Sequence, residues 1–345
     1  MDDQLISIAA LLDLVRSVFE AAGLAPGPAE AVARVVVAGE RDGCASHGLY
    51  RVDGCLGTLR AGLVEAAAVP AARPSAGGVV RVDAARGFTP PAFELGAPLL
   101  ARRAREVGLA ALAINDGTHF SALWPEVEDL AGRGLAALAL CPSYSAVAPA
   151  GGRGPLLGTN PMAFAWPRPG RPPYVFDFAT SVAARGEVEL RRRAGEALPE
   201  GWALGPDGRP TTRPEEALAG ALLPFGGHKG SALSTMIELL GGAMIGDLTS
   251  PEAFAAMGGV PLLPRHGELI LAFDPAAFAA GRPGDPFARA EGLLDAIVGQ
   301  GARLPSQRRF AARAASEARG ILVPQAEIRR LERLARGGAA APPTL

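Results

Sequence analysis

The sequence predicts an α/β protein with helical segments at both ends. Hydrophobic residues make up 49% of the 345 residues and charged residues 20%, so the chain can bury a substantial core; a disordered or fibrous chain is excluded. From about residue 79, short apolar runs alternate with helical patterns, which is typical of an α/β fold. Helical patterns on both sides of this region indicate two lobes, with the ends of the chain packed together.

The N-terminal segment is expected to form three helices. Ser7 can cap a first helix whose apolar residues share one face, and Gly23 suits the left-handed turn that ends it. A second helix should span about 28–41 and a third should run to about residue 62. The segment Ser46-His47-Gly48-Leu49-Tyr50-Arg51 leads into the third helix after a Gly-rich turn.

The middle of the chain has the apolar runs expected of strands. Strands are predicted at 79–82, 109–114 and 135–140, with helices at 92–107 and 122–131 between them. A stretch rich in Gly and Pro, 148–173, is followed by a strand at 174–178. A polar insertion, 198–214, then precedes Gly226-Gly227-His228-Lys229-Gly230, after which Ser231 can cap a helix running to about residue 245.

The C-terminal part becomes helical again. Beyond a strand at 268–273, helices are predicted at 287–298, 310–318 and 326–335. The last residues are typical of a loose tail.

Charge and hydropathy exclude several classes of function. Thirty-four basic and 35 acidic residues give a net charge of −1, so we expect neither nucleic acid nor anionic membrane as a partner. The longest apolar runs fall well short of the ~20 residues that cross a bilayer, and the first residues lack a basic region, so a cytoplasmic protein is expected. Cys44, Cys55 and Cys141 have no CxxC spacing, and no helix pairs His with carboxylate ligands, so no disulfide or metal site is expected.

Three of the four histidines invite a functional interpretation. His47 lies close to Arg51, which pairs a group that exchanges protons near neutral pH with a cation that grips carboxylates. This pairing suits a 2-oxo or 2-imino acid substrate. The alternative interpretation is that the segment is only the start of a helix, with His47 and Arg51 as surface side chains. His119 follows a predicted strand, where open α/β sheets build sites, and His228 precedes Lys229. His266 lies in a Pro/Arg/Gly loop, where we expect it to be solvated.

A standard dinucleotide fingerprint is absent. The nearest match, 152–158, has one residue too many and does not open a helix. Gly226-Gly227-His228-Lys229-Gly230-Ser231 is better placed, because glycines before a helix expose N–H groups to an anion and Lys229 adds a charge. A Gly-rich turn with a solvated lysine is the alternative. Lys229 is the only lysine among the 34 basic residues.

Together these segments resemble the malate/L-lactate dehydrogenase-like oxidoreductases. Within that family they are most similar to the Δ1-piperideine-2-carboxylate/Δ1-pyrroline-2-carboxylate reductases. The resemblance covers about residues 5–323. The segments that carry it are Ser46-His47-Gly48 with Arg51, Thr118-His119-Phe120, Val147-Ala148-Pro149, Leu157-Gly158-Thr159-Asn160-Pro161, Phe176–Ser181 and Pro224–Ser234.

The resemblance implies a homodimer with a non-Rossmann NAD(P)-binding fold that reduces a C=N bond beside a carboxylate. Residues 1–78 and 284–337 would form a helical lobe for substrate and dimerisation, 79–283 the α/β NAD(P)-binding domain, and 338–345 a flexible tail. Ser46 and Glu187 would relay to the proton donor His47, and Glu187 would raise the pKa of His47. Arg51 would hold the substrate carboxylate, and His119 would line the same pocket.

The resemblance also implies cofactor contacts, with NADPH favoured over NADH because an arginine cluster could meet a 2′-phosphate. Two departures from the family are Cys55, where a tyrosine is common, and Pro305-Ser306-Gln307. The alternative substrates are a 2-oxo or 2-hydroxy acid and an N-alkyl imino acid. A remote alternative function is that of a non-catalytic nucleotide-binding protein. The expected cofactor-binding residues are Ser143, Phe176, Asp177, Phe178, Ala179, Thr180, His228, Lys229, Gly230, Ser231, Ala232, Leu233, Ser234, Arg303, Arg308 and Arg309.

Overall fold

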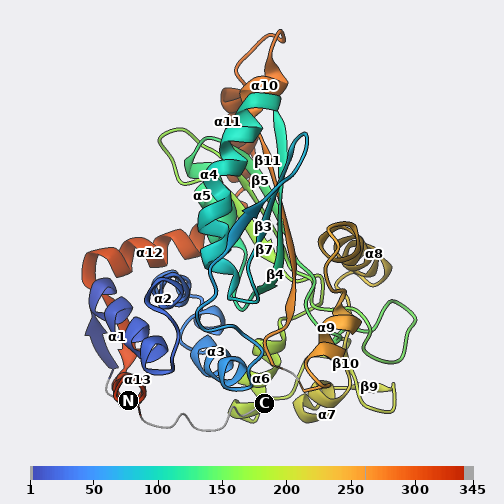
Figure 1. Cartoon of the computed structure of the whole chain (residues 1–345). Coiled ribbons are helices and arrows are strands. Elements are labelled where there is room, and N and C mark those ends of the chain that lie inside the picture. The colour runs from blue at the N-terminus through green and yellow to red at the C-terminus, as the bar shows by residue number, and fades with distance from the viewer. Residues whose placement is uncertain (1–2, 261, 338–345) are drawn as a thin grey trace.

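A seven-stranded mixed sheet forms the centre of the protein (Figure 1). The computed structural model describes residues 3–260 and 262–337, so the tail expected at 338–345 lies outside the described residues. The strand order is β2-β3-β4-β11-β5-β6-β7, and only the neighbours β3 and β4 are parallel. The strands are β2 (Ala71–Arg73), β3 (Val79–Asp83), β4 (Leu109–Thr118), β11 (Arg265–Phe273), β5 (Ala136–Leu140), β6 (Met162–Trp166) and β7 (Tyr174–Phe178).

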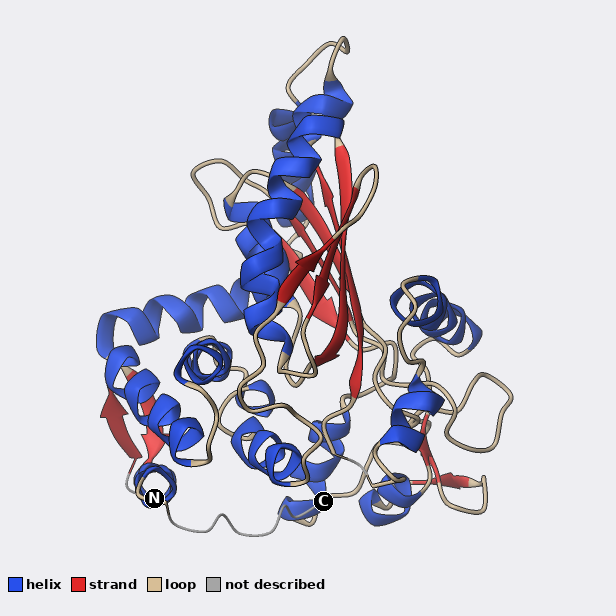
Figure 2. Cartoon of the chain, viewed as in Figure 1, coloured by secondary structure: helices blue, strands red, loops and turns tan. Residues whose placement is uncertain are grey.

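Helices cover one face of this sheet. The helices α4 (Thr89–Val107) and α5 (Trp124–Gly132) pack against it, as Figure 2 shows. Alternation along the strands explains the choice of face: Val80 and Val82 are buried in this core, whereas Arg81 between them is exposed. The core beneath the helices includes Leu100, Leu112, Ile114, Leu130 and Ile270.

The two ends of the chain pack together, as the sequence predicts. The strand β1 (Asp3–Ile6) pairs antiparallel with β12 (Ile321–Pro324), and one core joins residues from both ends. Ser7 caps α1 by accepting a hydrogen bond from the N–H of Ala10, as expected. The helices at these ends are α1 (Ile8–Ala21), α2 (Pro26–Arg41), the 3-10 turn η1 (Ala45–His47), α3 (Arg51–Arg60), α12 (Gln307–Arg319) and α13 (Gln325–Ala335).

Smaller elements lie near the same end of the sheet as α3 (Figure 1). They are α6 (Arg185–Ala194), β8 (Ala203–Leu204), β9 (Pro210–Thr211), α7 (Pro214–Ala219), β10 (Ala221–Leu222), α8 (His228–Ile237), the π-helical η2 (Glu238–Met244) and α9 (Ser250–Ala256). The sequence predicts that Ser231 caps α8, and this prediction is wrong. The helix begins earlier, with Gly227 at its N-cap, and the Ser231 hydroxyl accepts a hydrogen bond from Ala150.

Two further helices, α10 (Pro275–Ala279) and α11 (Pro286–Gly299), follow β11 in the chain. An ion pair between Arg168 and Glu291 and the contact of Trp166 with Phe287 attach α11 to the end of β6. The division of the chain near residue 284 stays a prediction. Within the part of the chain that the structure describes, no helix has both the length and the apolar composition to span a membrane.

Candidate functional site

Two glycines allow the His47 segment to lie against α2. A Cβ added to Gly39 would come within 2.5 Å of the carbonyl oxygen of His47, and a Cβ on Gly48 would collide with the carboxyl group of Glu40. That carboxyl group instead accepts a 2.7 Å hydrogen bond from the N–H of Leu49. Close backbone approach therefore requires glycine at both positions.

Contacts from three sides orient His47. The Ser46 hydroxyl oxygen lies 3.0 Å from Nδ1 of His47, and the Ser121 hydroxyl donates to the His47 carbonyl oxygen at 3.1 Å. The ring of Trp124 meets the imidazole edge-on, with the centroids 5.9 Å apart. The expected pairing of Ser46 with His47 is therefore present.

Glu187 does not raise the pKa of His47, contrary to expectation. Burial, followed by the charges of Arg51 and His119, lowers the pKa of His47 to about 3. Glu187 is half-exposed in the first turn of α6, and its carboxylate lies 3.7 Å from Arg191. Its neighbour Gly186 does face Ser46 and Tyr50, so the start of α6 adjoins the site even though the hydrogen-bond chain contains only Ser46 and His47.

Arg51 is a half-buried cation that has no ionic partner among the described residues. Within residues 3–260 and 262–337, no carboxylate forms an ion pair with its guanidinium, and Nε is buried without a hydrogen bond. Burial lowers the pKa of Arg51, and the guanidinium lies 5.7 Å from the centre of the Tyr50 ring. Cys55, which follows one turn later in α3, is fully buried. A guanidinium whose Nε is buried without a partner is costly, so this site is suited to an incoming anion.

His119 lies close to His47 and belongs to a cluster of buried ionisable groups. It is 8% exposed, and its Nε2 lies 3.6 Å from a carboxylate oxygen of Glu126. Glu268 completes a group of three side chains, each of which has one nitrogen or oxygen atom within 4.8 Å of those of the other two. The solvated position expected for His266 is wrong: it is buried on β11, and its ring stacks against His119 at 6.4 Å. Pairing of β11 with β4 is a long-range contact, which explains the error.

The start of α8 is a candidate for binding the phosphates of a dinucleotide. Gly226 and Gly227 have φ values of 56° and 61°, in the left-handed region that favours glycine. The ten-residue helix begins without a side-chain cap, and both His228 and Lys229 are exposed there. The N–H groups of Gly227, Lys229 and Gly230 already donate to backbone carbonyl oxygens. This helix start therefore offers an anion the helix dipole and the exposed side chains of His228 and Lys229. Of the other residues expected here, Ala232 is exposed, Ser231 and Leu233 are half-buried, and Gly230 and Ser234 are buried.

Asn160 joins the Leu157–Pro161 loop to α8, η2 and α9. Its amide nitrogen donates to the hydroxyl and carbonyl oxygens of Ser234 and to Glu238, the last at 2.7 Å. Its amide oxygen accepts hydrogen bonds from the N–H of Ser143 and the hydroxyl of Ser250. Ser143 and Ser234 thus meet at one buried network, in which Asn160 is 0% exposed.

The Phe176–Thr180 segment contains both exposed and structural side chains. Phe178 is 42% exposed, and its ring stacks on Phe176 at 4.9 Å, so an aromatic surface is available here. Ala179 is half-buried, and Thr180 is buried with its hydroxyl on the carbonyl oxygen of Thr159. The Asp177 carboxylate accepts hydrogen bonds from the N–H groups of Leu123 and Trp124, so it holds the start of α5.

The arginines expected near a 2′-phosphate differ in their surroundings. Arg303 and Arg308 are exposed and have no ion pair within the described residues. Arg309 is 7% exposed and forms ion pairs with Asp42 and Glu128, while its guanidinium lies 4.9 Å from the centre of the Trp124 ring. Two carboxylates already neutralise this cation, so Arg309 does not fit the phosphate-binding role expected of it.

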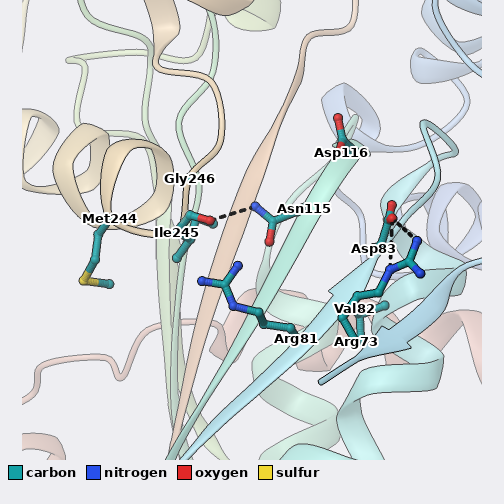
Figure 3. A pocket seen from close by; sticks show the side chains of 9 residues that line it. All are labelled: Arg73, Arg81, Val82, Asp83, Asn115, Asp116, Met244, Ile245 and Gly246. Carbon is teal, nitrogen blue, oxygen red and sulfur yellow. Dashed lines mark hydrogen bonds and ion pairs between the residues drawn. The ribbon is translucent and has the colours of Figure 1, made fainter. Parts of the chain in front are cut away.

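A pocket of about 410 Å³ lies away from these residues, between β3, β4 and the end of η2 (Figure 3). Arg73 in its wall is paired with Asp83, and Asn115 donates to the carbonyl oxygen of Ile245. None of the predicted site residues lines it. The candidate site is therefore placed at His47 and Arg51 on chemical grounds.

Three residues near the site were missed by sequence reasoning. Trp124 contacts His47, while Glu126 and Glu268 surround His119. The Trp124-Pro125-Glu126 segment directly after the His119 motif was the available signal for the first two. Glu268, inside an apolar strand, gave no pattern other than a charge in an unexpected place.

Comparisons with known proteins identify relatives of nearly the whole chain. The model of the malate/L-lactate dehydrogenase family matches residues 6–332. A Δ1-pyrroline-2-carboxylate reductase of Agrobacterium fabrum is 62% identical over 338 residues, which cover 98% of each chain. A Δ1-pyrroline-2-carboxylate/Δ1-piperideine-2-carboxylate reductase of Pseudomonas aeruginosa is 55% identical over 302 residues, covering 88% of this chain and 90% of the relative.

A solved structure is also similar over nearly the whole chain. The Δ1-piperideine-2-carboxylate reductase of Pseudomonas syringae pathovar tomato superposes with a TM-score of 0.91 at 44% identity, covering 96% of this chain and 99% of the other. The fold expected from the resemblance is thereby confirmed. The chain belongs to the malate/L-lactate dehydrogenase family.

Proposed function

We propose that this protein reduces cyclic 2-imino acids, converting Δ1-pyrroline-2-carboxylate to L-proline and Δ1-piperideine-2-carboxylate to L-pipecolate with NADPH. The observation that carries the proposal is Arg51 beside the Ser46–His47 pair. Its side chain is half-buried, and its Nε is buried without a hydrogen-bond partner among the described residues. The names of relatives that are 62% and 55% identical support the same substrate class.

Arg51 binds the substrate carboxylate in this proposal. A carboxylate would give the guanidinium the ionic and hydrogen-bonding partner that it lacks within the described residues. His119 lines the same pocket. Cys55 supplies only a small buried side chain one turn beyond Arg51.

His47 supplies the proton to the imine nitrogen, held in orientation by Ser46. Its low pKa means that it is neutral before substrate arrives. The substrate carboxylate offsets the charge of Arg51, which is one cause of that low pKa, and thereby favours the imidazolium. Glu187, at the start of α6, completes the relay if its carboxylate turns from Arg191 toward Ser46.

A nicotinamide cofactor supplies hydride when bound. His228 and Lys229 at the start of α8 would hold its phosphates, and Phe178 offers an aromatic surface. Arg303 and Arg308 would meet the 2′-phosphate of NADPH, which is why NADPH is preferred to NADH.

We further propose a cytoplasmic homodimer in which residues 1–78 and 284–337 form the lobe for substrate and dimerisation and residues 79–283 form the NAD(P)-binding domain. Light scattering of the purified protein measures the dimer directly, and a monomer at micromolar concentration would contradict it.

The experiment is NADPH consumption with the two cyclic imines and pyruvate in parallel. Turnover of either imine well above pyruvate is expected, and the better imine identifies the ring size. Turnover of pyruvate alone would move the assignment to the 2-oxo acid reductases.

Arg51→Gln tests the carboxylate contact. A charge-assisted hydrogen bond contributes about 1.5–3 kcal/mol, so KM for the imine should rise at least tenfold. Arg60→Gln, at the exposed end of the same helix, is the matched control and should leave KM unchanged. Equal KM values in the two variants would exclude Arg51 from substrate binding.

A further inference from the structure

A buried set of ionisable side chains lies behind the candidate substrate site. His119 follows β4, Glu126 lies on α5 and Glu268 lies on β11. They are 8%, 2% and 1% exposed, and one nitrogen or oxygen atom from each side chain lies within 4.8 Å of those of the other two. The 3.6 Å between His119 and Glu126 is longer than a hydrogen bond, so charge attraction dominates this contact.

The carboxyl groups of this cluster lack hydrogen-bond partners. Among the described residues, neither oxygen of Glu268 has a partner, and Oε2 of Glu126 has none. Two ionised carboxylates this close together, and removed from water, would repel each other strongly. A single proton shared between them removes the repulsion. One negative charge then remains, and it faces the imidazole of His119.

Of the ionisable groups packed in and around the cluster, His119 is the one that can carry a positive charge. Burial lowers the pKa of His266 to about 4, and its Nδ1 lies 2.9 Å from the carbonyl oxygen of Gly267. The pKa of His47 is also lowered, and burial raises the pKa of the Cys141 thiol. Asp177 on β7 holds the start of α5 and adds a further acidic group, whose pKa burial raises to about 6.

We propose that Glu126 and Glu268 are positioning residues that share one proton and hold His119 as an imidazolium at the substrate site. This role rests on the proposed function, because the imidazolium adds a second cation beside Arg51 for the substrate carboxylate. It also explains why His47 is neutral before an anion arrives, since the charge of His119 contributes to the low pKa of His47.

The balance of electrostatic effects on His119 agrees. Burial alone would lower the pKa of His119, but interaction with Glu126 and the charge of Glu268 outweigh it and raise that pKa. Burial raises the pKa of Glu268 and outweighs the lowering by the charge of His119, and Glu126 raises this pKa further. Glu268 is therefore the group that carries the shared proton at neutral pH.

Nitrogen-15 NMR of histidine-labelled protein tests the charge state without any substrate. The chain contains only four histidines, so the four signals can be assigned with single His→Asn variants. We expect His119 to be doubly protonated at neutral pH in the wild type, and neutral in the double variant Glu126→Gln/Glu268→Gln. A neutral His119 in the wild type would overturn the proposal, whatever the substrate is.

Steady-state kinetics test the consequence for substrate binding. Glu268→Gln keeps the charge of Glu126, so KM for the imine at neutral pH should stay within about twofold of wild type. The double variant should raise KM at least tenfold with a smaller change in kcat, as expected for loss of one charge-assisted contact. Asp129→Asn, an exposed acid of the same helix that pairs with Arg133, is the control.

The pattern across variants separates this role from a purely structural one. Equal KM values in the single and double variants, or a loss confined to kcat, would overturn the proposal. Stoichiometric divalent metal in the purified protein would also overturn it, because a metal ion would then balance the carboxylates. If the wild type does not turn over either imine, only the proposed function is refuted, because the NMR measurement of the charge of His119 does not depend on the substrate.

Discussion

Replacement of Arg309 should damage stability and not cofactor preference. Its guanidinium forms ion pairs with Asp42, whose side chain is 0% exposed, and with Glu128. Breaking a buried pair costs about 3–5 kcal/mol. Arg313 also contacts both carboxylates and Arg41 contacts Asp42, so both acids keep a partner. We therefore expect Arg309→Leu to lower the free energy of unfolding by about 2–3 kcal/mol.

Arg308→Leu is the matched variant, because the neighbouring side chain is exposed and has no ion pair among the described residues. Its unfolding free energy should stay within about 0.5 kcal/mol of wild type. Its ratio of kcat/KM for NADPH over NADH should fall at least tenfold if it meets the 2′-phosphate, which corresponds to about 1.4 kcal/mol or more.

Urea unfolding and the two cofactor titrations measure both quantities. Arg309→Leu should change the NADPH to NADH ratio by less than about twofold. The reasoning would be refuted if Arg309→Leu lost the preference for NADPH while retaining the unfolding free energy of the wild type. Unchanged cofactor preference in Arg308→Leu would remove only that residue from the phosphate site.

Three further outcomes are expected. Asn160→Ala removes five buried hydrogen bonds and should cost about 2–4 kcal/mol of unfolding free energy in urea; a loss below about 0.5 kcal/mol would contradict the network. The pKa of Glu268 is raised from 4.5 to about 8, so the folded state keeps this proton in a pH range where the unfolded state loses it. The free energy of unfolding therefore falls as the pH rises through this range, by up to about 1.4 kcal/mol per pH unit. In Glu268→Gln the free energy of unfolding should no longer show this decline with pH. A difference in unfolding free energy between the variant and the wild type that stays constant with pH would contradict the prediction. His47→Ala should lose at least about 10²-fold in kcat but still quench or enhance NADPH fluorescence on binding; near-normal turnover would exclude its role.

Local sequence patterns predicted many of the elements. Ser7 caps α1 as expected, and β7 has the predicted bounds of 174–178. The strand β6 was missed because it lies between Pro161 and Pro167 in a stretch rich in Gly and Pro, where local composition indicates loops. Its place in the sheet comes from pairing with β5 and β7, which a local window does not contain.

The candidate site was predicted where its residues are close together in the sequence. Ser46, His47 and Arg51 lie within one turn and the start of one helix, so their short spacing indicated a joint role. Glu126 and Glu268 come from a helix and a distant strand, and only the packing of α5 and β11 around His119 brings them together.

The sequence by itself determined the cap of α1, the periodicity of several strands, the family and the grouping of Ser46 and His47 with Arg51. The tertiary structure decided the electrostatic state of each group. Arg308 and Arg309 are adjacent and identical in kind, yet one is exposed and the other is paired with two buried carboxylates. Burial and pairing shift charge equilibria, and both depend on contacts between segments far apart in the chain.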